Sequence, residues 1–221
     1  MAAPKVKIAI EAGSKRAFAV ALDWPGWARG GKGEEEALAR LAEYAPRYAR
    51  AVGDRSPADA TLAVVERLTG GAGTDFGVPS AFAKADDRPL KSADLRREQR
   101  LLQAAWKAFD AAARRAKGKE LRLGPRGGGR SLEKMTMHVL EAEEAYLHQL
   151  GRRRPDSAKA DAQARMKAVR AASLEALAAR ARGEQPPNPN AVRKPWSPRY
   201  FVRRSAWHAL DHAWELEDRI L

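Results

Sequence analysis

The chain of 221 residues contains no cysteine. This excludes disulfide bonds, thiolate nucleophiles and cysteine-ligated metal sites, so a metal ion would have to be held by His, Asp or Glu. Long apolar runs are also missing: none approaches the roughly 18 residues that a membrane-spanning helix needs. The first residues, MAAPKVKIAIEAG, lack the layout of a secretory signal. We therefore expect a cytoplasmic protein with no membrane partner.

The net charge of +13 is unevenly distributed. Residues 1–85 hold 12 Lys and Arg against 10 Asp and Glu, whereas residues 86–221 hold 29 against 18. A basic excess can attract nucleic acid, phosphate or acidic metabolites, but a solvated arginine-rich surface gives the same composition. The basic residues are scattered along expected helices without interleaved aromatic residues, so we do not expect specific nucleic-acid binding.

The first half of the chain alternates between apolar and polar residues. Segments 6–10 and 18–22 are expected to be strands joined by a hairpin turn at residues 13–15. A helix is expected over residues 34–52, with acidic residues in its first turn and a kink at Pro46. A further strand is expected at 62–68 and a short one near 74–77. The pattern predicts a small α/β unit over residues 1–85.

From about residue 90 the apolar residues recur with helical spacing. Ser92 and Ser131 are candidate N-caps of the first two helices, the second ending near residue 150. A third helix is expected over about 158–182 and a fourth from Pro198 to the C-terminus. Residues 124–129 are expected to form a loop, and the proline-rich stretch 184–190 a long crossover. The boundary between the halves falls in the polar stretch at 80–90.

Histidine is scarce, since the chain has only His138, His148, His208 and His212. The motif HALDH places His208 and His212 four residues apart, so on a helix both imidazoles can reach one metal ion. His138 shares the apolar stripe of its helix, faces the core and can supply a third ligand. His148 lies about 80° off that stripe, at an expected exposed helix end. Core histidines without any ligand are the alternative.

Two glutamates accompany these ligands: Glu141 follows His138 by three residues, and Glu215 follows His212 by three. Each could hold an imidazole in one tautomer or complete the coordination; a solvated carboxylate is the alternative. Three imidazoles leave positions open for water or substrate, as catalytic sites do. The borderline divalent metals Zn, Ni, Fe or Mn suit such ligands, whereas Ca and Mg do not.

One histidine on the second helix followed by HxxxH on the last resembles the DinB/YfiT-like metalloprotein superfamily. HVLEAEEAYLHQLG, from residue 138, is similar to that family's second helix, and RRSAWHALDHAWELEDR, from residue 203, to its closing helix. The resemblance covers roughly residues 90–221. It implies an up-up-down-down four-helix bundle in which His138, His208 and His212 bind the metal, and it gives His148 no counterpart.

The first half is similar to HicB-like domains, small α/β units often found in antitoxins. The resemblance rests on FAVALDWPGWARGGKGEEEALARLAEYA, from residue 18: a strand, a Pro-Gly turn, a Gly-rich link and a helix that starts with acids. We therefore expect an α+β chain, with a HicB-like α/β domain over residues 1–85 and a DinB-like four-helix bundle over residues 88–221.

The DinB resemblance implies a metal-dependent transferase that uses a low-molecular-weight thiol, with a metal-dependent hydrolase as the alternative enzyme. Either would use the metal to lower the pKa of a bound thiol or water. Aromatic residues and Arg199 before the last helix could line a pocket for a thiol cofactor or an anionic small-molecule substrate, or could merely pack that segment. Arg203 and Arg204 are further candidates for holding a carboxylate. The aromatic residues are Trp196, Tyr200 and Phe201.

A different class of function is a non-enzymatic regulatory or nucleic-acid-associated binding module. The basic second half and the HicB-like domain motivate it. A metal site that is purely structural is a third alternative, and a homodimer is compatible with the sequence. An open pocket at the ion would favour an enzyme, whereas a continuous basic face with strongly salt-dependent affinity would favour nucleic-acid binding.

Overall fold

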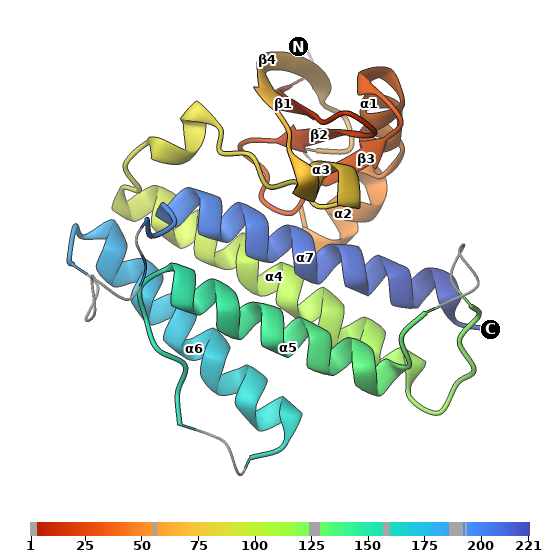
Figure 1. Cartoon of the computed structure of the whole chain (residues 1–221), viewed down its shortest axis with the longest axis vertical. Coiled ribbons are helices and arrows are strands. Elements are labelled where there is room, and N and C mark those ends of the chain that lie inside the picture. Colours follow the sequence, from red (N-terminus) through yellow and green to blue (C-terminus); the bar gives the residue numbers. More distant parts are fainter. Residues whose placement is uncertain (1–3, 55–56, 124–128, 157–159, 186–191, 193) are drawn as a thin grey trace.

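The computed structural model describes residues 4–54, 57–123, 129–156, 160–185, 192 and 194–221. A four-stranded sheet lies in the first part of the chain and long helices follow it (Figure 1). Among the described residues, none of the helices combines the length and the hydropathy needed to cross a membrane. The elements are β1 (Lys5–Ala12), β2 (Ala17–Ala21), β3 (Ala28–Gly31), α1 (Glu34–Glu43), α2 (Ala45–Val52), β4 (Thr61–Thr69), α3 (Ala72–Phe76), the 3-10 turn η1 (Lys84–Asp87), α4 (Ser92–Ala116), α5 (Leu132–Gln149), α6 (Ala162–Ala181) and α7 (Pro198–Arg219).

The strands are ordered β3-β2-β1-β4. β1 and β2 form the predicted antiparallel hairpin, in which Ile10 lies opposite Ala19. β4, also predicted, runs parallel to β1. A parallel pair cannot be closed by a tight turn, and the chain makes the connection through β3, α1 and α2.

The two faces of the sheet contact different helices. Ile8 and Ile10 of β1 join Leu41 of α1 in the main hydrophobic core. On β2, the ring of Phe18 meets the ring of Trp207 on α7 edge to face, with 6.2 Å between their centroids. The apolar/polar alternation in the sequence indicates one buried face, whereas β2 is buried at every position, and its second face packs against α7.

Two local predictions in this part are wrong. Residues 28–31, expected as a Gly-rich link, form β3, and glycine is needed there because a Cβ on Gly31 would lie 2.5 Å from the amide nitrogen of Ala37. The short strand expected near 74–77 is the helix α3, which ends at Gly77 with a φ of 112°, a conformation that favours glycine. The kink predicted near Pro46 is present, since the helix expected over 34–52 divides at Tyr44, two residues before Pro46.

The helix starts in the second half follow the capping residues. Ser131 and Ser197 cap α5 and α7 with hydrogen bonds from backbone N–H groups to their side chains, and Asp161 caps α6 in the same way. At α4 the N-cap is Lys91, and Ser92 is the first helical residue, so the predicted Ser92 cap is wrong by one position. The loop predicted at 124–129 and the stretch at 184–190 lie largely outside the described residues.

Helices α4 and α7 run in one direction, and α5 and α6 run in the other (Figure 1). Arg199 at the start of α7 pairs with Asp94 at the start of α4, and Leu121 bridges to Ile220 beyond the far ends of the same two helices. The start of α7 also meets the end of α5, where the backbone N–H of Trp196 donates to the carbonyl of Gln149. The expected up-up-down-down order is therefore wrong, because the helices run up, down, down and up.

The crossover between parallel helices lies before α6 and not in the proline-rich stretch before α7 (Figure 1). Residues 150–161 connect α5 to α6. Twelve extended residues reach about 40 Å, enough to return along the roughly 27 Å of α5. Proline content alone could not locate the crossover, because all three links between the helices of this half contain proline and are at least as long as residues 150–161.

The two halves share one hydrophobic core. It runs from Ile8 in the sheet and Trp27 after β2 to Leu101 of α4 and Leu210 of α7. Either half alone would expose part of this surface to water. The division into separable domains at residues 1–85 and 88–221 therefore stays a prediction.

A buried ion pair links α7 to the segment at residues 80–90, where the boundary between the two halves was expected. Asp86 of η1 is 3% exposed and Arg203 of α7 is 5% exposed. Arg203 donates from Nε to the Asp86 carboxylate at 3.1 Å and from a terminal nitrogen to the carbonyl of Ala81 at 3.0 Å. Arg203, a candidate for holding a substrate carboxylate, is thus engaged in joining α7 to the end of the α/β part.

We predict that Arg203→Ala lowers the free energy of unfolding by about 3–5 kcal/mol, because it leaves the Asp86 carboxylate buried and unpaired. The matched control is Arg67→Ala, which removes the exposed pair with Glu34 and should cost less than about 1 kcal/mol. Urea denaturation of the three proteins measures both values. Equal losses in the two variants would contradict the anchoring role of the buried pair.

Candidate metal centre

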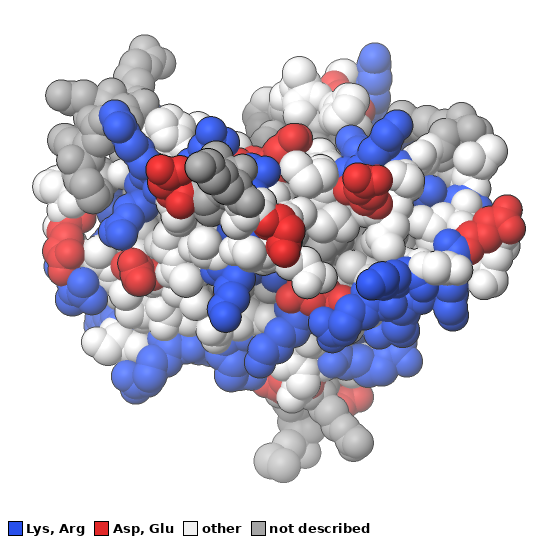
Figure 2. Space-filling view, turned by 90° about the horizontal axis from the view of Figure 1, so that it is seen from below, with Lys and Arg blue, Asp and Glu red and all other residues white. Residues whose placement is uncertain are grey.

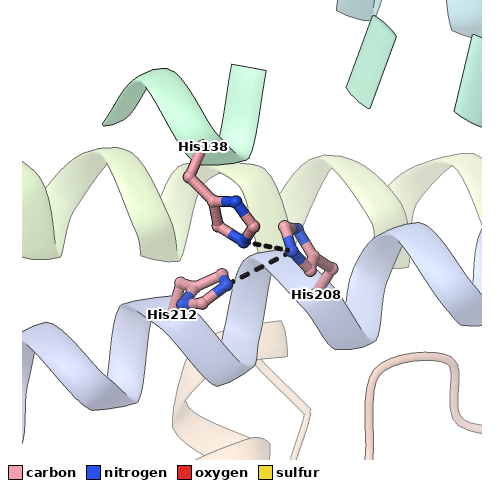
Figure 3. Close-up of side chains that lie close together, drawn as sticks. All are labelled: His138, His208 and His212. Atoms are coloured by element: carbon pink, nitrogen blue, oxygen red, sulfur yellow. Dashed lines mark hydrogen bonds between the residues drawn. The ribbon is translucent and has the colours of Figure 1, made fainter. Parts of the chain in front are cut away.

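Three histidines from two helices converge on one point (Figure 3). Nε2 of His208 lies 3.3 Å from Nε2 of His138 and 3.2 Å from Nε2 of His212. His208 and His212 occupy successive turns of α7, and His138 reaches them from α5. His208 is 6% exposed and His212 is 8% exposed, so the cluster sits inside the helical part.

A chain of hydrogen bonds fixes one of the rings. Nδ1 of His212 lies 3.0 Å from a carboxylate oxygen of Glu215, whose other oxygen accepts a bond from Arg219 at 3.1 Å. An ionised carboxylate only accepts hydrogen bonds, so His212 carries its proton on Nδ1 and presents the lone pair of Nε2 to the cluster. Glu215 is therefore placed to orient a candidate ligand, which is one of the roles that the sequence analysis left open for it.

The surroundings of His138 and His208 disfavour the charged form of both rings. Burial, together with the charges of the neighbouring His212 and Arg130, lowers the pKa of His138 to about 4. Burial also holds the pKa of His208 well below its usual value, together with the charges of His212 and Arg204. For Glu215, burial would raise the pKa, but its bonds to His212 and Arg219 outweigh that effect and lower it. A neutral imidazole beside an ionised acid is the protonation state in which histidine binds metals.

The donor set fits a divalent metal ion. Convergent Nε2 lone pairs repel one another unless a proton or a cation lies among them, and the low histidine pKa values make a shared proton costly. The three nitrogens lie close enough together to hold one ion. Nδ1 of His208 is buried without a hydrogen-bond partner among the described residues. All three ligands are nitrogen atoms, which suits Zn, Ni, Fe or Mn better than Ca or Mg.

Glu141 and His148 do not join this centre. Both belong to α5, and both are exposed along a separate surface cavity that also borders Glu144. Glu141 follows His138 by the same three residues that separate Glu215 from His212, but the structure places no hydrogen bond between Glu141 and His138 among the described residues. The sequence separated His148 from the cluster but could not tell the two glutamates apart.

The residues that the sequence analysis expected to line a pocket near the start of the last helix mostly pack against other parts of the protein. Arg199 donates to the carbonyls of Arg88 and Pro89 and pairs with Asp94, and its side chain is only 14% exposed. These contacts occupy the guanidinium that was expected to hold a cofactor or substrate. Phe201 is part of the main core. The hydroxyl of Tyr200 donates to the carbonyl of Ser80, and its ring stacks on Phe82.

Two further residues lie beside the centre: Tyr146, which the sequence analysis missed, and Arg204, which it named only as one of three arginines that could hold a carboxylate. The ring of Tyr146 on α5 meets the ring of His208 edge to face at 5.6 Å. The guanidinium of Arg204 lies 5.3 Å from the centre of the Tyr146 ring and 4.7 Å from that of Trp207. One terminal nitrogen of Arg204 is buried without a partner among the described residues. Its position four residues before His208 could have identified it as the cation on the ligand face.

Comparisons with known proteins agree with the helical part. A family model described as the DinB superfamily matches residues 101–216, which include all three clustered histidines and more than half of the chain. Neither the search of curated proteins nor the search of solved structures gave a match. Because the family model spans more than half of the chain and its matched segment carries the histidine cluster, the chain belongs to the DinB superfamily.

Proposed function

We propose that this protein binds one divalent transition metal ion through His138, His208 and His212 and uses it in a transfer or hydrolysis reaction. The observation that carries the proposal is the convergence of three imidazole nitrogens in a largely buried site. Three protein ligands leave coordination positions for a further ligand, which a closed structural site would not do. Membership of the DinB superfamily supports the same conclusion.

A bound ion would supply acidity, since it lowers the pKa of a thiol or water ligand and so provides the nucleophile that this cysteine-free chain lacks. The chain's own residues prepare the site. Glu215 holds His212 in the ligating tautomer, and Arg219 keeps Glu215 ionised. Tyr146 covers one side of His208 and limits its contact with water.

We further propose that the substrate or thiol carries a negative group and that Arg204 binds it. The sequence offered Arg199 and, as further candidates, Arg203 and Arg204; the contacts support Arg204. Arg204 contacts the rings that flank His208 and retains an unpartnered donor, whereas Arg199 is held by the α/β part. A guanidinium can bind a carboxylate through two parallel hydrogen bonds, which would fix the orientation of the bound molecule.

The rival proposal is a regulatory or nucleic-acid-associated module built on a HicB-like domain. The basic excess and the sheet-and-helix order of the first part support it. It ranks second because several of the arginines are engaged in ion pairs within the protein, Arg170, Arg199 and Arg203 among them. It also leaves the histidine cluster without a role.

We predict one metal ion per chain in protein purified without a histidine tag. His208→Ala and His212→Ala should reduce the metal content to near zero, and so should His138→Ala, because two imidazoles hold a transition metal far more weakly than three. His148→Ala is the matched control and should keep the full stoichiometry. Metal analysis by mass spectrometry gives the result, and retention of metal by His138→Ala with loss in His148→Ala would refute the assignment.

The two glutamates provide a second test. Glu215→Gln should weaken metal affinity about 10- to 100-fold, because a carboxylate that orients a ligating imidazole also raises its basicity. Glu141→Gln has the same spacing from its histidine and should leave the affinity unchanged. Competition with a chromogenic chelator measures both dissociation constants. If the two variants bind metal equally, Glu215 has no part in the centre.

A third test addresses thiol chemistry with cobalt as the bound metal. Adding mercaptoacetate should produce sulfur-to-cobalt charge-transfer absorption at lower concentrations than adding mercaptoethanol, because Arg204 attracts the carboxylate. Arg204→Gln should remove this preference while leaving the cobalt stoichiometry intact. If neither thiol perturbs the spectrum of the cobalt-loaded protein, thiol transfer fails and metal-dependent hydrolysis is preferred.

A further inference from the structure

A second cavity lies on the side of α5 away from the histidines. It has a volume of about 620 Å³ and is bounded by α4, α5 and α6. Thr136 lines it, and His138 is two residues further along α5, which is about 200° around the helix. The volume lies within the range of about 300–1,000 Å³ that is usual for small-molecule sites. The cavity is therefore separate from the proposed metal centre and large enough for an organic ligand.

The floor of this cavity is apolar and rigid. Trp106 and Phe109 of α4 and Met166 of α6 line it, and each is at most 5% exposed. Ala113 lines it with only a methyl group, which leaves space where a larger residue would fill it. Nε1 of Trp106 is a buried hydrogen-bond donor without a partner among the described residues. An indole N–H buried in this way usually finds an acceptor.

One wall of the cavity is a fixed ion-pair network. Arg170 of α6 donates to both oxygens of Glu143 at 2.9–3.1 Å and to both oxygens of Asp110 at 2.8 and 2.9 Å. Its guanidinium lies 5.4 Å from the centre of the Trp106 ring. Two carboxylates balance this arginine, so it shapes the wall and keeps Trp106 in place without attracting an anion strongly.

The other charged residues of the lining are mostly cations. Lys107 and Arg114 of α4, Lys117 just after it and Lys167 of α6 are exposed, and none forms an ion pair with a described residue. The remaining acid of the lining is Glu133. Figure 2, seen from the side on which α6 lies, shows Lys and Arg spread over much of this face. The cavity thus combines an aromatic floor with an excess of unpaired positive charge.

We infer that this cavity binds an amphipathic organic anion, with its apolar body on Trp106 and Phe109 and its carboxylate or sulfonate among the lysines. The apolar body would remove the aromatic floor from water, which an inorganic anion cannot do. The negative group would meet cations that have no other partner and would lie within reach of a buried N–H donor. This inference does not depend on the metal centre.

The probe is 1-anilinonaphthalene-8-sulfonate, an aromatic sulfonate whose fluorescence rises in apolar surroundings. Titration of the intact, folded chain should saturate at one molecule per chain. Decanoate should displace the probe, whereas decyltrimethylammonium, which has the same tail and a positive head, should displace it at least tenfold less effectively. Equal displacement by both surfactants, each below its micellar concentration, would overturn the anion assignment.

Variants locate the binding. Ala113→Phe should fill the cavity and abolish saturable binding while leaving the metal content and the thermal transition in place. Lys107→Gln combined with Lys167→Gln should weaken binding roughly tenfold or more, since bonds to charged groups contribute about 1.5–3 kcal/mol. The matched control removes two exposed lysines of β1, Lys5→Gln with Lys7→Gln, and should bind the probe like the parent. Unchanged binding in Ala113→Phe, or an equal loss in the β1 control, would refute the site.

Discussion

Helix α7 is enclosed on nearly every side, and this enclosure positions the rest of the molecule. Trp207 packs against the sheet, Leu210 lies in the main core, and His208 and His212 face α5. A helix without a clear polar stripe cannot be oriented by hydrophobic burial alone, because most of its rotations bury similar apolar area. Specific polar contacts must select the rotation. Arg203 makes such a contact with η1, and at the other end Arg219 donates to the carbonyl of Arg122.

The same enclosure sets the chemistry of the histidines. Exclusion of water disfavours the charged imidazolium of His138 and His208, so these two rings offer lone pairs at neutral pH. The folded chain therefore holds the imidazole nitrogens of the cluster close together, and their mutual repulsion lowers its stability. A bound cation would offset this cost. Metal binding would then be coupled to folding, because an ion that binds only the folded arrangement stabilises it. Glu215 stays ionised in the same surroundings because His212 and Arg219 both contact it.

The sequence predicted the elements whose signal is local. The hairpin, the division of the first helix near Pro46, the Ser131 cap of α5 and the spacing of His208 and His212 all depend on residues close together in the chain. Segments of four or five residues, β3 and α3, were assigned wrongly because tertiary contacts outweigh propensity over so short a length. Helix directions also escaped prediction, since they depend on how distant surfaces pack.

The sequence could not predict side-chain roles where two residues of the same type occupied equivalent local positions. Glu141 and Glu215 have identical spacing from a histidine, yet one lies on an exposed flank and the other beside Arg219. The position of a residue on a helix gives its angle but does not say which neighbouring helix covers that angle. Arg199 and Arg204 differ in the same way: the α/β part binds the first, and aromatic rings next to the metal centre surround the second.

The distribution of charge gains meaning only once these contacts are known. Net charge counts Arg170 and Arg203 as if they were available to a partner, but both are bound to carboxylates inside the protein. The cations without such partners include those around the cavity of α4, α5 and α6, where they border an apolar floor. A nucleic-acid backbone would need a continuous basic surface and would leave that floor unfilled. The basic character of the second half is therefore better matched by a small amphipathic anion than by a polyanion.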